Sequence, residues 1–317
     1  MTPEQCAREY IRYTAVINSL DKGNLRFVMC GPNGHDVEWT RRLMAEWSAR
    51  KWQEAPTFGV SVHYYCGNAG DPLAFTEDEW YLQLFKADRM RRVIDDHRAA
   101  MDGLDPERKL ALVVDEWGCW HPDGSGPSKG YNLFEQQSTM RDAMVAATTL
   151  NAFNNRADIV AMANVAQLCN NLHSLYLAAG EHFVETPNYY VFDLFKTHMG
   201  GRQLNSFNDL GAYEREGFAP MDRLSSSASV KDDGAFTLTL ANRSVTESAR
   251  VKLRALGGSL DGVARVRTLC DADPHAHNDF KHPDRVRPSE AIMELANGVE
   301  IDVPAGGIVA IIREVIP

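Results

Sequence analysis

The sequence predicts an α/β region followed by an all-β region. Up to about residue 203, short apolar segments alternate with helical segments of ten or more residues, a pattern typical of βα units around a parallel sheet. Beyond that point, segments with a period of two are separated by turn signals such as Asp232–Gly234. We expect these later segments to form an antiparallel β-sandwich or jelly roll.

Capping residues and apolar spacing place the elements of the first region. Thr2 and Gln5 form a capping box before the first helix, and Thr76 and Glu79 form another. The continuous apolar run at 110–114 is typical of a strand that is covered on both faces. The expected helices cover about 2–20, 36–47, 76–101, 134–151 and 189–198, and the expected strands cover 25–30, 58–65, 110–114 and 159–163.

The second region begins with a polar stretch from Asn205 to Asp233, which contains three consecutive serines. Alternating apolar residues follow it and indicate strands. These strands are expected around Phe236–Leu240, Val251–Ala255, Val299–Val303 and Ile308–Val315.

Composition excludes several classes of protein. Lys and Arg number 33 against 43 Asp and Glu, and the resulting net charge of -10 disfavours nucleic acid and anionic membrane as partners. No run approaches the roughly 18 apolar residues of a membrane span, and the first residues lack the pattern of a signal peptide. We therefore expect a cytoplasmic protein, in which the six scattered cysteines are reduced thiols without zinc-site or disulfide spacing: Cys6, Cys30, Cys66, Cys119, Cys169 and Cys270.

Chemistry-bearing residues gather where three of the predicted strands end, which is where parallel α/β folds place their catalytic groups. One strand ends in His63-Tyr64-Tyr65, the next in Asp115-Glu116-Trp117, and the last continues through Asn164 to Gln167. These residue types are what a sugar site needs. A carboxylate faces the oxocarbenium-like centre, amides bind the hydroxyl groups, and an aromatic ring packs against the face of the sugar.

Five ordered motifs resemble glycoside hydrolase family 51, the retaining α-L-arabinofuranosidases. They are His63–Tyr65, Val114–Trp120, Gln136–Ala143, Met162–Gln167 and Thr186–Phe192. The resemblance continues at Asn278–Phe280 and Val299–Pro304, which are similar to that family's C-terminal domain.

The resemblance implies a role for five residues. Glu116 would be the nucleophile and Tyr65 its hydroxyl partner, while His63 and Gln167 would bind or support the arabinose subsite and Trp120 would form an aromatic wall. The implied reaction is a double displacement that releases terminal arabinofuranosyl units from arabinan or arabinoxylan oligosaccharides. It needs no metal or organic cofactor, and the relatives are commonly homo-oligomers. The sequence departs from the family pattern at Cys119, His121, Asn171 and His173.

The resemblance also implies that part of the enzyme is absent. Only four strands are expected before residue 203, whereas a (β/α)₈ barrel has eight and typically needs about 250 residues. The sequence therefore predicts strands five to eight of a TIM barrel over residues 1–203 and a β-sandwich over 204–317, without the acid/base Glu. We expect Met1 to be an internal methionine or the gene to be truncated, and an open half barrel to associate or be unstable. Strand alternation should turn Asp115 away from the site.

Other interpretations remain open. The chain could be a non-catalytic carbohydrate-binding or assembly remnant, or a member of another family of the same barrel clan that acts on xylan or glucan. His63 and Tyr65 could be packing residues at the rim of the sheet, and Gln167 could simply bind backbone. Cys66 and Cys119 lie next to site residues but are interpreted as taking no part in catalysis. A further acidic and histidine-rich cluster is interpreted as a polar loop rather than a metal site; its residues are Asp271, Asp273, His275, His277, Asp279 and His282.

Overall fold

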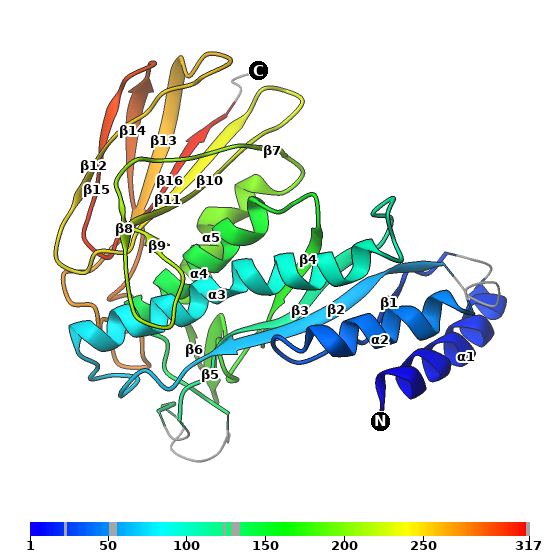
Figure 1. The fold of residues 1–317 in the computed structure, drawn as a ribbon. Coiled ribbons are helices and arrows are strands. Elements are labelled where there is room, and N and C mark those ends of the chain that lie inside the picture. Colours follow the sequence, from blue (N-terminus) through cyan, green and yellow to red (C-terminus); the bar gives the residue numbers. More distant parts are fainter. Residues whose placement is uncertain (22–23, 51–55, 123–124, 128–133, 315–317) are drawn as a thin grey trace. The chain divides into compact units, whose positions relative to one another are not determined.

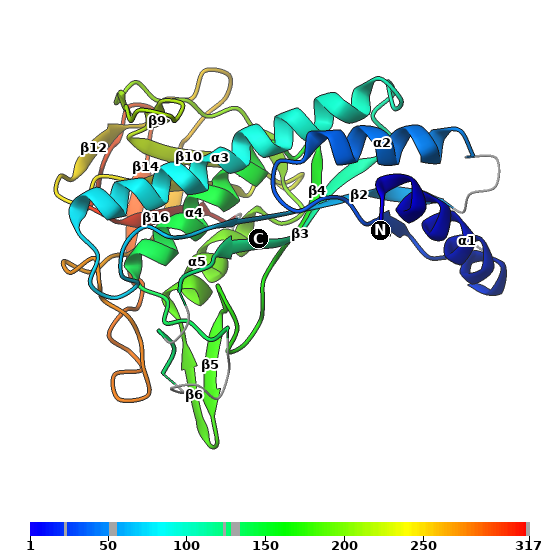
Figure 2. The ribbon, with the colours of Figure 1, turned by 60° about the horizontal axis from the view of Figure 1, so that its bottom comes forward.

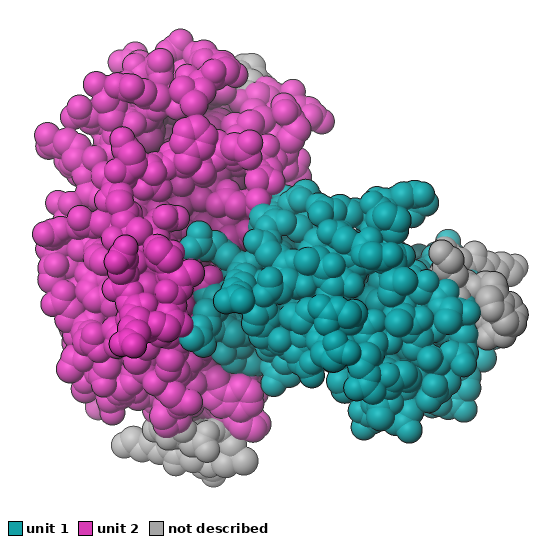
Figure 3. All heavy atoms as spheres, in the orientation of Figure 1, with its two compact units in different colours: residues 1–65, 89–117, 156–165 teal, residues 66–88, 118–155, 166–317 magenta. Residues whose placement is uncertain are grey.

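The computed structural model describes residues 1–21, 24–50, 56–122, 125–127 and 134–314. The chain forms two compact units, which are coloured separately in Figure 3. Unit 1 comprises residues 1–65, 89–117 and 156–165, and unit 2 comprises residues 66–88, 118–155 and 166–317. Three elements, formed by residues 57–66, 77–102 and 111–119, run from one unit into the other.

The strands of the α/β region form one four-stranded sheet in sequence order, β1-β2-β3-β4 (Figure 1). β1 pairs with β2 in parallel, and β3 pairs with β4 in parallel. The expected alternation of strands and helices is confirmed. Its elements are α1 (Pro3–Asp21), β1 (Phe27–Met29), α2 (Val37–Ser48), β2 (Thr57–Cys66), α3 (Glu77–Asp102), β3 (Ala111–Cys119), α4 (Met140–Asn154) and β4 (Val160–Val165).

Local signals explain where the first helices begin. The hydroxyl of Thr2 accepts the Gln5 amide at 3.3 Å, and the Gln5 side chain accepts the Thr2 amide at 2.9 Å, which is the expected capping box. A carboxylate oxygen of Asp36 accepts the Trp39 amide at 3.0 Å and caps α2. The apolar faces then pack inward, and fully or nearly fully buried side chains include Ala7, Ile11, Leu43, Met44, Trp47, Val60, Val62, Leu112, Val113 and Val114.

The all-β region of unit 2 is built around a six-stranded sheet in the order β14-β13-β16-β11-β10-β7. Every pair of neighbours in it is antiparallel. A separate two-stranded sheet joins β12 to β15. The strands are β7 (Arg202–Leu204), β10 (Leu224–Val230), β11 (Phe236–Asn242), β12 (Ala249–Lys252), β13 (Gly262–Leu269), β14 (Ser289–Leu295), β15 (Glu300–Val303) and β16 (Ile308–Arg313), with a short ladder of β8 (Ala212–Tyr213) and β9 (Met221–Asp222).

Alternation along these strands buries one continuous cluster between the two sheets. It includes Leu224, Phe236, Leu238, Leu240, Leu253, Val266, Leu295, Ile301, Val303, Val309 and Ile311. Helices α4 and α5 (Pro187–Phe195) lie beside the six-stranded sheet in Figure 1 and contact strands β10, β11, β13 and β16.

The polar stretch before residue 233 contains an unexpected strand. β10 includes the serine run, and Ser225 and Ser227 are buried. Asn151 of α4 donates to the Ser225 hydroxyl at 3.1 Å and accepts from the Ser227 hydroxyl at 2.7 Å. Buried polar groups need hydrogen-bond partners. The side-chain amide of Asn151 supplies them here, so this strand forms without alternating apolar residues.

Further differences concern unit 2, where strands β7, β8, β9, β13 and β14 were also not expected. Helix α4 begins at Met140 rather than at Phe134, because Thr139 and Asp142 form a capping box. Helix α5 begins at Pro187, is capped by Thr186 and gives way at Lys196 to a 3₁₀ turn that ends at His198. A hairpin of β5 (Tyr176–Ala179) and β6 (His182–Glu185), visible in Figure 2, was not expected. The expected end of the last strand at residue 315 and part of the loop at 122–130 lie outside the described residues.

Within the described ranges, no helix combines the length and the apolar character needed to cross a bilayer.

Candidate active site

The candidate site lies where β2 and β3 end within unit 1. Tyr65 and Glu116 come from these two strands, and the Tyr65 hydroxyl donates to Glu116 Oε2 at 2.7 Å. The Glu116 side chain is 45% exposed, so a molecule in solution can reach its carboxylate. The contact joins a carboxylate to a hydroxyl donor, which fixes the direction in which the carboxylate points.

His63 lies between two carboxylates on the neighbouring strand. Its Nε2 is 2.8 Å from Asp115 Oδ1, and its Nδ1 is 3.8 Å from Glu116 Oε2. The expectation that Asp115 turns away from the site is therefore wrong. The register of β3 against β4 shifts between Val114 and Trp117, and such an irregularity breaks the alternation that the expectation assumed.

The loop after β1 holds the backbone of His63. The His63 amide donates to the Pro32 carbonyl at 3.2 Å, and the Gly34 amide donates to the His63 carbonyl at 2.6 Å. Gly31 makes this approach possible, because a Cβ at that position would lie 1.8 Å from the Ser61 carbonyl oxygen. The glycine of this loop therefore contributes to the placement of His63.

The electrostatics of the site follow from these contacts. The hydrogen bond to Asp115 raises the pKa of His63, and the charges of Asp115 and Glu116 add to that effect against the opposing effect of burial. Burial, followed by the hydrogen bond to Glu116, raises the pKa of Tyr65. Tyr65 therefore stays a hydrogen-bond donor, and the imidazolium form of His63 is favoured next to both carboxylates.

Cys30 ends β1 beside this group. A hydrogen bond from Cys6 of α1 lowers the pKa of Cys30 to about 6, and the positive charge of His63 acts in the same direction. Sequence reasoning missed both Asp115 and Cys30. The signal for Asp115 was present in the adjacent carboxylates, but the register shift that turns both of them toward β2 is not visible in the sequence.

Trp120 and Gln167 belong to unit 2. The Trp120 side chain is 42% exposed, and its ring stands edge-on to Phe134 with the centroids 5.4 Å apart. Gln167 is exposed, and its backbone amide donates to the Asn171 carbonyl at 3.1 Å. Both side chains are open to solvent, as residues that contact a ligand must be.

The other cluster singled out in the sequence forms a network of internal contacts. His275 Nδ1 lies 2.9 Å from Asp273 Oδ1, and Arg285 pairs with the second oxygen of that carboxylate at 2.8 Å. His275 also contacts the Phe75 carbonyl through Nε2 at 2.8 Å. These partners are what a polar loop requires.

A partly exposed carboxylate that is held by a tyrosine hydroxyl and flanked by an imidazole is suited to nucleophilic attack on a sugar. This is the kind of site found in glycoside hydrolases, and comparison with known proteins specifies it further. The α-L-arabinofuranosidase C-terminal domain family model matches residues 115–306. The chain therefore belongs to the α-L-arabinofuranosidase family and corresponds to the C-terminal portion of a family 51 enzyme.

Relatives agree with this assignment. The chain is 30% identical to an intracellular exo-α-L-arabinofuranosidase from Bacteroides ovatus, over 98% of this chain and 60% of that protein. It is 26% identical to an intracellular exo-α-(1→5)-L-arabinofuranosidase from Streptomyces lividans, over 90% of this chain and 44% of that protein. The crystal structure of a family 51 arabinofuranosidase from Xanthomonas axonopodis pv. citri superposes with a TM-score of 0.87 at 30% identity, over 98% of this chain and 63% of that one. The chain thus spans about half of the length of the curated relatives it matches.

Proposed function

We propose that this chain carries the nucleophile and part of the sugar subsite of a retaining exo-α-L-arabinofuranosidase. The hydrogen bond of 2.7 Å between Tyr65 and Glu116 is the observation that carries the proposal. It provides a carboxylate that is held in one orientation and remains accessible, which a retaining mechanism requires of its nucleophile.

In the proposed step, Glu116 Oε attacks the anomeric carbon of a terminal α-L-arabinofuranosyl unit. The bond from that carbon to the glycosidic oxygen breaks, and its electron pair leaves with the oxygen. Tyr65 keeps the attacking carboxylate in line, and His63 holds Asp115 through Nε2 while its Nδ1 faces Glu116. Trp120 and Gln167 would contact the substrate, and the proposal assigns no acid/base group to this chain.

The fold supports the same proposal. The β1-β2-β3-β4 sheet with its helices would be strands five to eight of a TIM barrel over residues 1–203, and residues 204–317 would be the accompanying β-sandwich domain. The substrates would be arabinan or arabinoxylan oligosaccharides, and the setting would be cytoplasmic. The names of two curated relatives, both intracellular exo-α-L-arabinofuranosidases, support the setting and the kind of sugar that is released.

The test uses an aryl α-L-arabinofuranoside with an activated leaving group, which departs without help from an acid. The chain is incubated with this substrate, and its intact mass is followed with time. We expect the mass to rise by one arabinosyl unit and peptide mapping to place the unit on Glu116, because water attacks the ester slowly without a base.

Glu116→Gln is the isosteric control and should show no adduct. Glu46→Gln, a carboxylate of α2 in the same unit, should label like the unaltered chain. A folded chain, shown by circular dichroism, that forms no adduct would refute the catalytic proposal. If the same chain bound arabino-oligosaccharides in a calorimeter, the non-catalytic binding alternative would take its place.

A further inference from the structure

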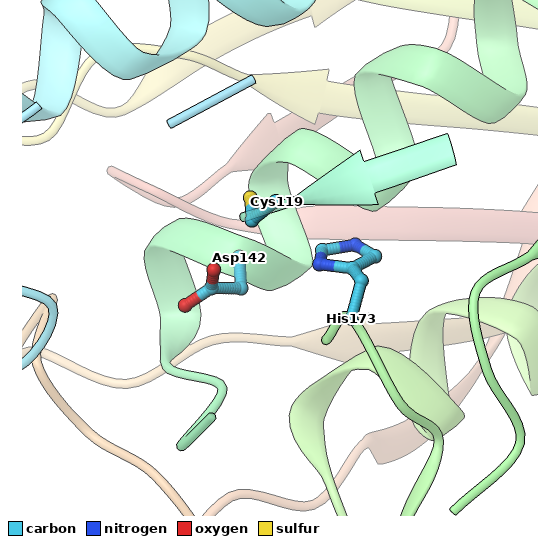
Figure 4. Close-up of side chains that lie close together, drawn as sticks. All are labelled: Cys119, Asp142 and His173. Carbon is cyan, nitrogen blue, oxygen red and sulfur yellow. The ribbon is translucent and has the colours of Figure 1, made fainter. Parts of the chain in front are cut away.

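Three ligand-type side chains from separate parts of the sequence meet inside unit 2 (Figure 4). Cys119 ends strand β3, Asp142 lies in the first turn of α4, and His173 lies in the loop that follows Ala166. One ligand atom from each residue falls within 4.8 Å of the other two. All three are at most 1% exposed. A thiol, a carboxylate and an imidazole therefore surround one buried point.

The carboxylate in this cluster is fixed and charged. Asp142 Oδ2 accepts the amide and the hydroxyl of Thr139 at 2.8 and 3.0 Å, and Oδ1 lies 2.7 Å from His121 Nε2. Burial by itself raises the pKa of Asp142, but the charge of His121 and its hydrogen bond outweigh burial and hold that pKa well below the ordinary value. Asp142 is thus presented as an oriented carboxylate with lone pairs left to donate.

The imidazole of His173 is held close to the end of strand β3. Gly118 has φ +140°, and a Cβ there would lie 2.4 Å from His173 Cβ. The glycine lets His173 approach the end of β3 next to Cys119, and a neutral imidazole is the form that binds metal ions.

The sulfur atom of Cys119 has a side-chain donor beside it. Gln83 directs its Nε2 at Cys119 Sγ at 3.4 Å, and also at Cys66 Sγ at 3.1 Å. Such a donor can stabilise the sulfur once a metal ion has replaced its proton.

Two buried polar atoms beside the cluster lack a hydrogen-bond partner in the part of the chain that the structure describes. His121 is 2% exposed, and its Nδ1 is buried without a hydrogen-bond partner among the described residues. Gln83 is fully buried, and its Oε1 also has no hydrogen-bond partner within the described ranges. Buried polar atoms usually have partners, and two such atoms beside one cluster indicate that a further species belongs there.

We propose that Cys119, Asp142 and His173 form a binding site for a single Zn²⁺ ion. Thiolate, imidazole and carboxylate together suit zinc, whereas Ca²⁺ and Mg²⁺ prefer sites made of oxygen atoms alone. Zinc binds sulfur at about 2.3 Å and nitrogen or oxygen at about 2.0–2.2 Å, and the three ligand atoms, which lie within 4.8 Å of one another, would close onto one ion between them. Binding replaces the Cys119 proton, which leaves to solvent, and His121 orients the Asp142 carboxylate.

The three ligand-type residues come from separate segments of unit 2, and His121 contacts the Asp142 carboxylate beside them. The ion would join the end of β3, the start of α4 and the loop after β4, and so stabilise unit 2. This inference does not depend on the proposed arabinofuranosidase activity.

The experiment measures metal bound to the full chain. The protein is produced in medium supplemented with Zn²⁺, purified under reducing conditions and analysed by elemental mass spectrometry. We expect about one zinc per chain. Production with Co²⁺ in place of Zn²⁺ should give the near-ultraviolet sulfur-to-cobalt charge-transfer band that reports a thiolate ligand.

Cys119→Ser and His173→Gln should each lose most of the bound metal, and Cys119→Ser should also lose the charge-transfer band. Folded His173→Gln decides the matter if Cys119→Ser does not fold. Cys169→Ser and His282→Gln, which alter exposed residues elsewhere, are matched controls and should bind metal as the unaltered chain does. Zinc no higher in the unaltered chain than in folded His173→Gln would overturn the proposal and leave an internal hydrogen-bond network only.

Discussion

Asp105→Ala tests how unit 1 holds strand β3, the strand that carries Glu116. Asp105 lies between α3 and β3 and is buried, as is Arg98 of α3. Its Oδ2 accepts from Arg98 Nη2 at 3.1 Å and from the Leu110 amide at 3.0 Å, and its Oδ1 accepts the Lys109 amide at 2.9 Å. One carboxylate therefore pairs a buried guanidinium and caps the two backbone amides that lead into β3.

The expected cost follows from what the alanine leaves behind. Removing one partner of a buried ion pair costs about 3–5 kcal/mol, because the other charge stays buried without its counterion. Arg98 keeps its bonds to the Leu110 carbonyl at 2.8 Å and to Asp102 at 2.9 Å, which places the loss near the middle of that range. A loss of about 4 kcal/mol corresponds to a fall in Tm of roughly 16–32 °C for a unit of about 100 residues.

Differential scanning calorimetry of the variant measures the shift, and two further variants calibrate it. Asp105→Asn keeps an oxygen acceptor but loses the charge, so its loss should be about half as large. Asp158→Ala removes a 55% exposed carboxylate that lies 3.6 Å from Arg156, and it should cost below about 1 kcal/mol. A Tm for Asp105→Ala within about 2 °C of that of Asp158→Ala would refute the reasoning.

Three other outcomes are expected at the candidate site. Tyr65→Phe removes the contact that holds the Glu116 carboxylate in one orientation. Because misplacing a reacting group can cost about 100-fold, the arabinosyl adduct should form up to about 100-fold more slowly, and an unchanged rate would count against the role of Tyr65. Asp115→Asn should lower the pKa of His63 in an NMR titration. Because the folded pKa of His63 lies above its unfolded value, the contact stabilises the fold at acidic pH and its contribution is lost as the pH rises through the raised value; a variant with the same pH dependence would contradict this. Iodoacetamide at pH 7 should alkylate Cys30 first among the exposed thiols, because its pKa is lowered to about 6, and peptide mapping that finds another thiol first would refute the assignment.

Much of the α/β region follows from local sequence signals. The capping residues Thr2 and Asp36 and the apolar run before Asp115 place their helices and strand to within a few residues. These signals act through neighbouring backbone groups and through periodicity, which the sequence contains in full. They also place Tyr65 and Glu116 at the ends of adjacent strands.

Other features depend on contacts between distant residues. Strand β10 forms because Asn151 satisfies buried serines, and that pairing is invisible in a polar stretch of sequence. The helix expected from Phe134 starts six residues later, because Thr139 and Asp142 form a capping box that fixes its first turn at Met140.

The sequence by itself determined the order of the helices and strands of the four-stranded sheet, the family and the residues expected to carry the reaction, because local periodicity, caps and ordered motifs are properties of the chain alone. Only the tertiary structure decided which side chains meet. It turned Asp115 toward His63 through a shift in strand register, and it gathered Cys119, Asp142 and His173 around one buried point. The physical reason is that register and burial are set by long-range packing, which fixes the direction of a side chain only after separate elements have come together.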